Sequence, residues 1–196
     1  PSLPGYGLSA NAQATGWGVE KIADAWSTLM ARVGYSQDFA QGGDWGSVIT
    51  SYIARQDPKH CLGIHINMGI VAPDPNAENL TANELSIMAG WKYYQDWDSG
   101  YSKQQATRPQ TLGYGLVDSP SGQAAWIVEK FYQWMDCGGH PENIVSRDEL
   151  LDNIMVYWLT GSGASSAQLY WESFGGGEGR EQPVLIPMGA TISAKD

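Results

Sequence analysis

Gln41-Gly42-Gly43-Asp44-Trp45-Gly46 is the stretch of this sequence that decides its fold. It contains Gly-x-Asp-x-Gly, the pattern of a nucleophile elbow with an aspartate where a serine is more common. In an elbow a strand turns sharply into a helix, so the central side chain stands exposed at the tip. Glycines flank it because the helix must pass close to neighbouring strands. The chain has 24 glycines among 196 residues, so the pattern by itself also fits an ordinary turn.

The residues on either side of the motif favour the elbow. Phe39 and Ala40 give a short apolar lead-in that fits a brief strand. After the motif, apolar residues recur at helical spacing and form one stripe: Trp45, Val48, Ile49, Tyr52 and Ile53. Pro58 predicts the end of this helix, because the residue before a proline is pushed out of the helical region. Strand, aspartate and helix stand in the order that the motif requires.

The wider pattern predicts a parallel α/β sheet with a helical insertion. A helical stripe runs from Trp17 to Val33, and apolar and polar residues alternate from Leu62 to Met68 as in a strand. With the elbow, the order is helix, strand, helix, strand, which is typical of a parallel sheet. The following signals are almost all helical and include capping boxes that begin at Thr81 and Ser146.

Two changes of composition divide the chain into three parts. Prolines at 73 and 75 end the first α/β pattern, and a glycine-rich run at 175–179 ends the helical one. We therefore expect residues 1–74 to form the part of an α/β core that contains the elbow, residues 75–175 an all-helical lid, and residues 176–196 the return to the core. Within the last part, residues 183–187 predict a short buried strand.

Composition limits the partners of the chain. The formal net charge of -10 and a pI near 4.6 argue against nucleic acid or an anionic membrane, so neutral or apolar substrates fit better. Neither a membrane-spanning run nor a signal peptide is visible. We expect a cytoplasmic protein, while an anchor upstream of Pro1 stays open. Two distant cysteines, Cys61 and Cys137, leave a disulfide open, but we expect two buried or free thiols.

The chain resembles the epoxide hydrolase branch of the α/β-hydrolase fold, in particular the group of microsomal and juvenile-hormone epoxide hydrolases. The matching motifs run in the family's order across nearly the whole chain: PSLPGYGLS at 1–9, QGGDWGS at 41–47, GIHINM at 63–68, GY at 100–101, DSPSGQAAWIVEKF at 118–131, YWLTG at 157–161 and LYWE at 169–172. The resemblance implies an α/β-hydrolase core with an inserted lid.

The resemblance also implies the roles of individual residues. Asp44 corresponds to the family's nucleophilic aspartate, and Tyr101 and Tyr170 correspond to the two lid tyrosines that hold the epoxide oxygen. The backbone N–H of Trp45 is expected to help form the oxyanion hole. Asp196 is the candidate for the acidic triad member, which follows the strand after the lid.

The chain departs from the family's pattern near both of its ends. The family commonly has Phe-Pro where Ser193-Ala194 stands, which weakens the match of Asp196. The family's His-Gly-Trp-Pro loop would precede Pro1, and its catalytic histidine, in a Gly-Gly-His context, would follow Asp196. The Gly-Gly-His at 138–140 lies in the lid region, in the wrong part of the order. We therefore expect an internal segment of a longer enzyme, unable to complete turnover alone.

An aspartate at the elbow suits substitution at a saturated carbon. Attack of a serine on an epoxide would give an ether, whereas Asp44 would give an ester that activated water can cleave. A tyrosine, with a pKa of about 10, can donate a hydrogen bond and then a proton to the opening epoxide oxygen. The expected reaction joins an apolar epoxide and water into a vicinal diol, without cofactor or metal.

Two other functions stay open. A haloalkane dehalogenase also uses an elbow aspartate, and Trp45 after the nucleophile suits it, because an indole N–H can bind halide. A non-catalytic ligand-binding relative would keep the pocket without the histidine. Judged by spacing alone, Tyr101 and Tyr170 are two of ten tyrosines and would be expected to pack the lid. A homodimer is also left open.

Overall fold

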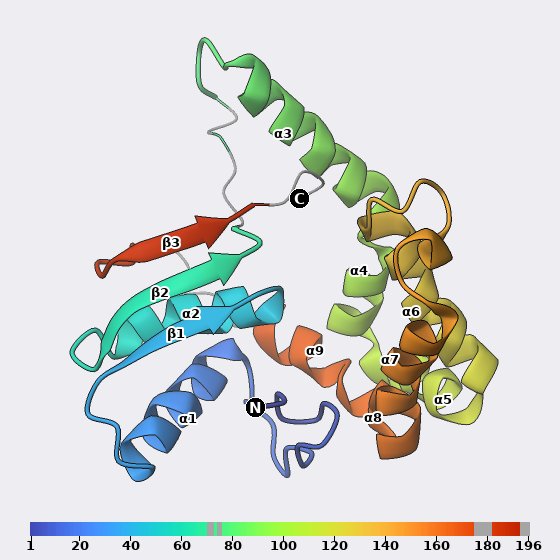
Figure 1. Cartoon of the computed structure of the whole chain (residues 1–196), viewed down its shortest axis with the longest axis horizontal. Helices are drawn as coiled ribbons and strands as arrows, with labels where there is room; N and C mark the ends of the chain where they lie inside the picture. Colours follow the sequence, from blue (N-terminus) through green and yellow to red (C-terminus); the bar gives the residue numbers. More distant parts are fainter. Residues whose placement is uncertain (70–72, 74–75, 175–181, 193–196) are drawn as a thin grey trace.

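A small parallel sheet carries the elbow. The computed structural model describes residues 1–69, 73, 76–174 and 182–192, and in this part of the chain the sheet has the order β1-β2-β3 (Figure 1). The strands are β1 (Asp38–Gly42), β2 (Cys61–Asn67) and β3 (Met188–Thr191), and both pairings are parallel. The last strand therefore returns beside β2 after the whole helical region, as expected for an insertion.

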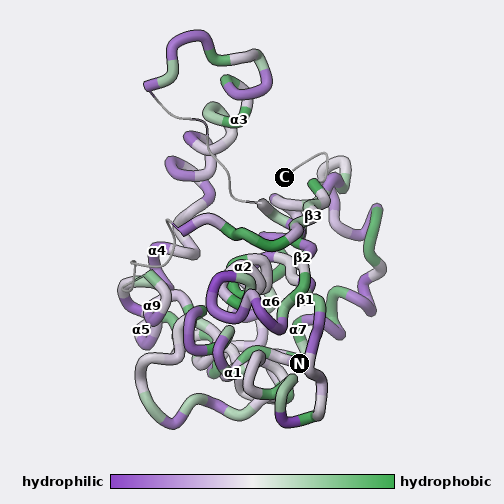
Figure 2. Tube along the Cα trace, turned by 90° about the vertical axis from the view of Figure 1, so that its left-hand side faces the viewer, coloured by the Kyte–Doolittle hydropathy of each residue, from purple (hydrophilic) through white to green (hydrophobic). Residues whose placement is uncertain are grey.

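Two helices cover this sheet and form the core with it. α1 (Val19–Arg32) packs along α2 (Trp45–Gln56), and α2 packs against β1 and β2 (Figure 1). Figure 2 shows hydrophobic residues along the strands beside α2. The buried side chains of this core are Val19, Ile22, Ala23, Ile49, Tyr52, Ile53, Ala54, Cys61, Ile64, Ile66 and Leu169. The last of these comes from the helical region, which ties that region to the core.

The segment between β2 and β3 is helical wherever it forms regular structure in the described residues. Its elements are α3 (Ala82–Tyr93), a π-helical turn η1 (Tyr94–Asp98), α4 (Gly100–Thr107), α5 (Pro109–Asp118), α6 (Pro120–Trp134), a 3-10 turn η2 (Pro141–Asn143), α7 (Arg147–Thr160), α8 (Ser162–Ser165) and α9 (Gln168–Phe174). The two predicted boundaries, at 74/75 and 175/176, fall outside the described residues and remain predictions. Among the described helices, none is both long and apolar enough to cross a membrane.

The helical elements pack on one another in pairs. α4 lies against α9, α5 against α8, and α6 against α7. α9 also contacts α1, so it connects the helical region with the core. In contrast, α3 buries none of its residues in the described structure and extends away from the other helices (Figure 1).

Local sequence signals account for several helix ends. Capping boxes form at Thr81 with Glu84 and at Ser146 with Glu149, as predicted. Gly161 ends α7 in the left-handed conformation, with a φ of 65°. These contacts satisfy backbone groups that each helix end leaves without a partner.

The predicted strand at 183–187 is wrong in position and in burial. The strand begins only at Met188, and all four of its residues are exposed in the described structure. Pro183 and Pro187 have no N–H to donate to a ladder, so regular pairing starts after the second proline. Pro187 still takes part through its carbonyl, which accepts from the N–H of Ile64 at 2.9 Å. Val184 packs, partly buried, against the core.

The two glycines of the elbow have different roles. A Cβ on Gly42 would lie 2.1 Å from the carbonyl oxygen of Gly46 and 2.7 Å from the hydroxyl of Thr50. A Cβ on Gly46 would meet no atom within 4 Å. The close approach of β1 and α2 therefore requires a glycine at 42 and tolerates a side chain at 46.

We predict that Gly42→Ala destabilises the protein by about 2 kcal/mol or more, because the new methyl group would overlap backbone that cannot move independently of the elbow. The matched control is Gly46→Ala, which places the same methyl group in open space in the first turn of a helix. Urea unfolding of both variants gives the comparison. Equal free energies of unfolding would contradict this account of the elbow.

Candidate active site

Asp44 occupies the bend between β1 and α2 in a strained conformation. Its φ is 52° and its ψ is -128°, a combination outside the favoured regions for a residue with a Cβ. Hydrogen bonds from the buried Ser47 stabilise this bend. The Ser47 hydroxyl donates to the carbonyls of Asp44 (2.8 Å) and Met68 (3.2 Å). The Asp44 carboxylate accepts from the N–H of Trp45. The side chain itself is exposed at the tip, as an elbow predicts.

Tyr101 and Tyr170 are brought together by the packing of α4 on α9. Their ring centroids are 6.0 Å apart, edge to face. Trp45, the residue after Asp44, packs its ring 4.9 Å from that of Tyr170. The two lid tyrosines therefore lie next to each other, and one of them contacts the residue that follows the elbow aspartate.

Both phenols are held in the protonated form. Burial raises the pKa of Tyr101 strongly, and its hydrogen bond with Tyr94 (3.3 Å between the hydroxyls) and the charge of Asp44 raise it further. Burial and the charge of Asp44 raise the pKa of Tyr170 to about 12, although hydrogen bonds from the side chains of Trp45 and Gln105 act in the opposite direction. At neutral pH both residues are hydrogen-bond donors.

Two further tyrosines, which sequence reasoning missed, belong to the same cluster. Tyr6 donates its hydroxyl hydrogen to the carbonyl of Ser166 at 2.8 Å, and its ring lies 6.5 Å from that of Tyr157. Burial raises the pKa of both, and the charge of Asp44 contributes in each case. Tyr6 and Tyr157 lie in two of the motifs that match the family, at 1–9 and 157–161. These matches are the sequence signal that could have identified both residues.

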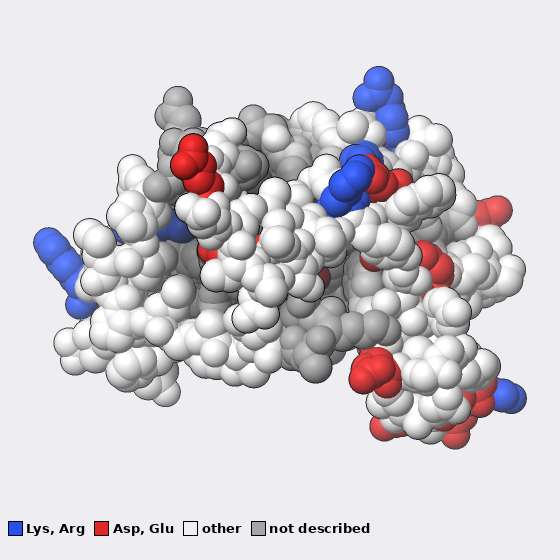
Figure 3. Space-filling model, turned by 90° about the horizontal axis from the view of Figure 1, so that it is seen from above, with Lys and Arg blue, Asp and Glu red and all other residues white. Residues whose placement is uncertain are grey.

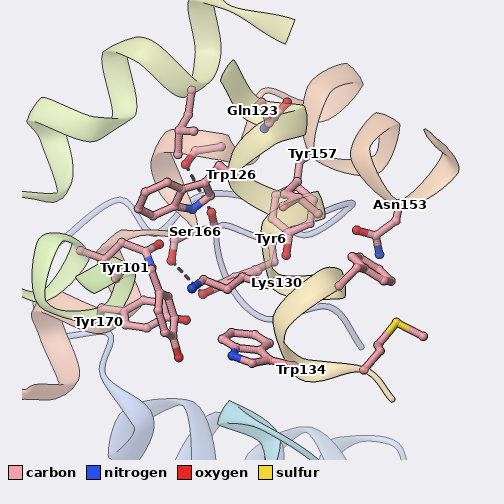
Figure 4. Close-up of a pocket in the computed structure, with 16 residues that line it drawn as sticks. Tyr6, Tyr101, Gln123, Trp126, Lys130, Trp134, Asn153, Tyr157, Ser166 and Tyr170 are labelled. Carbon is pink, nitrogen blue, oxygen red and sulfur yellow. Dashed lines mark hydrogen bonds between the residues drawn. The ribbon is translucent and has the colours of Figure 1, made fainter. Parts of the chain in front are cut away.

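A cavity of about 310 Å³ lies on the helical side of these tyrosines (Figure 4). Tyr6, Tyr101, Tyr157 and Tyr170 all line it, together with aromatic residues such as Trp126 and Trp134. Asp44 is not part of the lining, but its charge acts on all four tyrosines. The four phenols therefore line the cavity and lie within electrostatic reach of the Asp44 carboxylate.

Other predicted positions lie elsewhere. Asp196 and the preceding Ser193-Ala194 fall outside the described residues, so the role of Asp196 remains a prediction. His140 of the Gly-Gly-His at 138–140 caps the η2 turn, where its Nδ1 accepts from the N–H of Glu142 at 3.2 Å. This histidine belongs to a turn and lies outside the cavity lining.

The surface charge is dispersed. On the face shown in Figure 3, the Lys and Arg residues that the structure describes stand apart from one another and do not form a continuous basic patch. Acidic residues interrupt them, which agrees with the net charge of -10. This face offers no extended surface for a phosphate backbone.

Comparisons with known proteins point to one family. The chain is 45% identical, over 100% of its length, to a putative epoxide hydrolase of Stigmatella aurantiaca, of which it covers 44%. It is 39% identical over 89% of its length to the juvenile hormone epoxide hydrolase of Bombyx mori, and 35% identical over 90% to epoxide hydrolase 1 of Oryctolagus cuniculus. No protein-family model matches the chain.

Solved structures agree with these sequence matches. The crystal structure of the juvenile hormone epoxide hydrolase of Bombyx mori superposes on the whole chain with a TM-score of 0.84 and 35% identity, and 52% of that structure is covered. The Aspergillus niger epoxide hydrolase gives a TM-score of 0.84 with 27% identity, again over 100% of this chain and 50% of that one. The chain thus spans about half the length of the proteins it matches. By sequence and by fold, it is homologous to the epoxide hydrolases of the α/β-hydrolase superfamily.

Proposed function

We propose that this chain carries the nucleophile and the acid residues of an epoxide hydrolase, which adds water to an apolar epoxide and releases a vicinal diol. The observation that supports this most is the strained elbow residue Asp44 together with the paired phenols of Tyr101 and Tyr170, which line the cavity and whose pKa values the Asp44 charge raises. A nucleophile and two hydrogen-bond donors are the groups that epoxide opening needs at the same time.

In the first step the Asp44 carboxylate attacks a ring carbon of the epoxide. A C–O bond forms between carboxylate and carbon, and the ring C–O bond breaks with its electron pair on the epoxide oxygen. Tyr101 and Tyr170 hold that oxygen by hydrogen bonds, and one phenol gives it a proton. Their raised pKa values keep both protons in place until this moment.

In the second step the oxygen of a water molecule adds to the ester carbonyl carbon, the acyl C–O bond breaks, and the diol leaves with the oxygen of that bond. Of the two protons of this water, one goes to the departing diol oxygen and the other returns to the phenol, so Asp44 is a carboxylate again. The N–H of Trp45 already donates to the Asp44 carboxylate, so this donor is in position for the oxyanion that forms there. A histidine of the longer protein, supported by Asp196, would activate the water, as the resemblance implies. The lining of the cavity, with rings such as Trp126 and Phe131, favours an apolar substrate.

The alternative functions receive less support. The Trp45 side chain hydrogen-bonds to Tyr170, so its N–H is directed at the phenol instead of standing free for a halide. Strained backbone conformations cluster at active sites, so the strained bend at Asp44 favours a catalytic role over a purely ligand-binding one. Both observations favour the hydrolase.

We predict that Asp44→Ala in the full-length protein abolishes diol formation from styrene oxide, with a loss of about 1,000-fold or more, because no ester can form. Product is measured by chromatography, and the control is Asp24→Ala, which removes an exposed carboxylate from α1. Full activity of Asp44→Ala would refute the assignment. Halide release from a bromoalkane by the unaltered protein, with no diol from epoxides, would replace it by the dehalogenase.

We predict that Tyr101→Phe and Tyr170→Phe each lower the rate constant of ester formation by about 10- to 100-fold, and that the double variant loses more than either. Each change removes one donor to the epoxide oxygen and keeps the ring. Rapid-mixing fluorescence measures the step, and the control is Tyr114→Phe, at an exposed position on α5. Unchanged rates in both single variants would assign these tyrosines to packing.

The pH dependence of ester formation offers a separate check. A phenol acts as an acid only while protonated, and a pKa of about 12 at Tyr170 keeps its proton well above pH 10. We therefore predict that the rate constant in Tyr101→Phe, which retains Tyr170, stays level between pH 7 and about 10 and falls only above that range. A decline centred near 10, the ordinary tyrosine value, would mean that the acting phenol is not the buried one.

A further inference from the structure

Lys130 on α6 places a positive charge, only partly exposed to solvent, on the face of Tyr101. Its side chain is 15% exposed and lines the cavity (Figure 4). The Nζ atom lies 4.8 Å from the centroid of the Tyr101 ring and 5.3 Å from that of Trp134. Ammonium groups at such distances are attracted to the electron-rich face of an aromatic ring.

Asp98 holds this ammonium in place. It is the last residue of the η1 turn, its side chain is 10% exposed, and its Oδ1 accepts from Lys130 Nζ at 2.8 Å. Its Oδ2 accepts from the indole N–H of Trp134 at 2.7 Å. Asp98 precedes Tyr101 by three residues, so one carboxylate links the lysine of α6 to the start of the helix that carries the phenol.

A buried ion pair needs an explanation, since apolar residues of similar volume would often be as stable. Here the explanation lies in the charge that Tyr101 must carry. When its proton moves to the epoxide oxygen, the phenol is left with negative charge in a buried position beside Tyr94 and Tyr170. A cation on the ring face lowers the free energy of that charge.

We propose that Lys130, fixed by Asp98, is a positioning residue for epoxide opening: its ammonium orients the Tyr101 ring and stabilises the negative charge that Tyr101 takes on as its proton leaves. The inference rests on the proposed function. It is specific to one step, because the later cleavage of the ester takes place at the Asp44 carbonyl and needs no charge on Tyr101.

The first test separates the two chemical steps in the full-length enzyme. Lys130→Met alone would leave Asp98 buried and unpaired, so it is combined with Asp98→Asn, whose amide oxygen can still accept from Trp134. We expect this double variant to form the ester about 10-fold more slowly and to hydrolyse it at the unaltered rate. Lys130→Arg, which keeps the charge, should retain most of the rate.

The matched control is Lys103→Met, which removes an exposed lysine from α4, the helix that carries Tyr101. It should leave both rate constants unchanged. If the double variant lost the same factor in the rate constants of ester formation and ester hydrolysis, the Lys130–Asp98 pair would have a purely structural role and the proposal would be overturned. An undiminished rate of ester formation would overturn it as well.

A second test does not need turnover. The carbonyl oxygen of a small aliphatic carboxamide can accept hydrogen bonds from both phenols, whereas a hydrocarbon of the same shape cannot. Calorimetry should show that the double variant binds the carboxamide about 3- to 10-fold more weakly and the hydrocarbon as before. If the unaltered protein opens no epoxide, but the double variant still binds the carboxamide selectively more weakly than the unaltered protein does, the proposed reaction fails and the positioning role stands. Equal weakening of both ligands would overturn the role.

Discussion

The structure depends on one tight contact, where β1 passes under the first turn of α2. No side chain fits at Gly42, because the carbonyl of Gly46 occupies the place of its Cβ. This approach forces the chain to reverse within one residue, and Asp44 takes up the resulting strain, held by the hydroxyl of Ser47. A carboxylate on such a bend has lost much of its conformational freedom before any substrate binds, and this favours attack in one direction.

In the proposed function, the helical region supplies the hydrogen-bond donors that the elbow lacks. An exposed carboxylate in water is a weak nucleophile, and an epoxide oxygen needs donors on its other side. The contact of α4 with α9 brings together Tyr101 and Tyr170, to which the proposed function assigns this role, and seven of the sixteen residues that line the cavity are aromatic. Because α9 also packs against α1, the position of the phenols is coupled to the core and thereby to Asp44.

Local rules predicted the features that depend on neighbours in sequence. The elbow, the capping boxes at Thr81 and Ser146, and the end of α7 follow from short patterns, and the structure confirms them. The apolar run at 183–187 predicts a strand, but the prolines at both of its ends have no N–H to donate, and the strand begins only at Met188. Spacing could not show that Tyr6 and Tyr157 join Tyr101, since residues up to 151 positions apart meet only through packing. The resemblance points to Tyr101 and Tyr170. The Lys130–Asp98 ion pair becomes visible only in the folded structure, where α6 and the η1 turn meet.

The electrostatics of the site also suggest how the two events of ring opening are kept in order. Burial is the main cause that raises the pKa of the surrounding phenols, and the negative charge of Asp44 adds to it, so these phenols keep their protons. In the proposed mechanism ester formation neutralises Asp44, so the same event that generates the alkoxide removes one of the contributions that oppose phenolate formation. In this mechanism, proton transfer from Tyr101 becomes more favourable once attack has begun. A stronger acid in this position would ionise beside the carboxylate in the resting state, whereas a buried phenol keeps its proton until the bond to carbon forms.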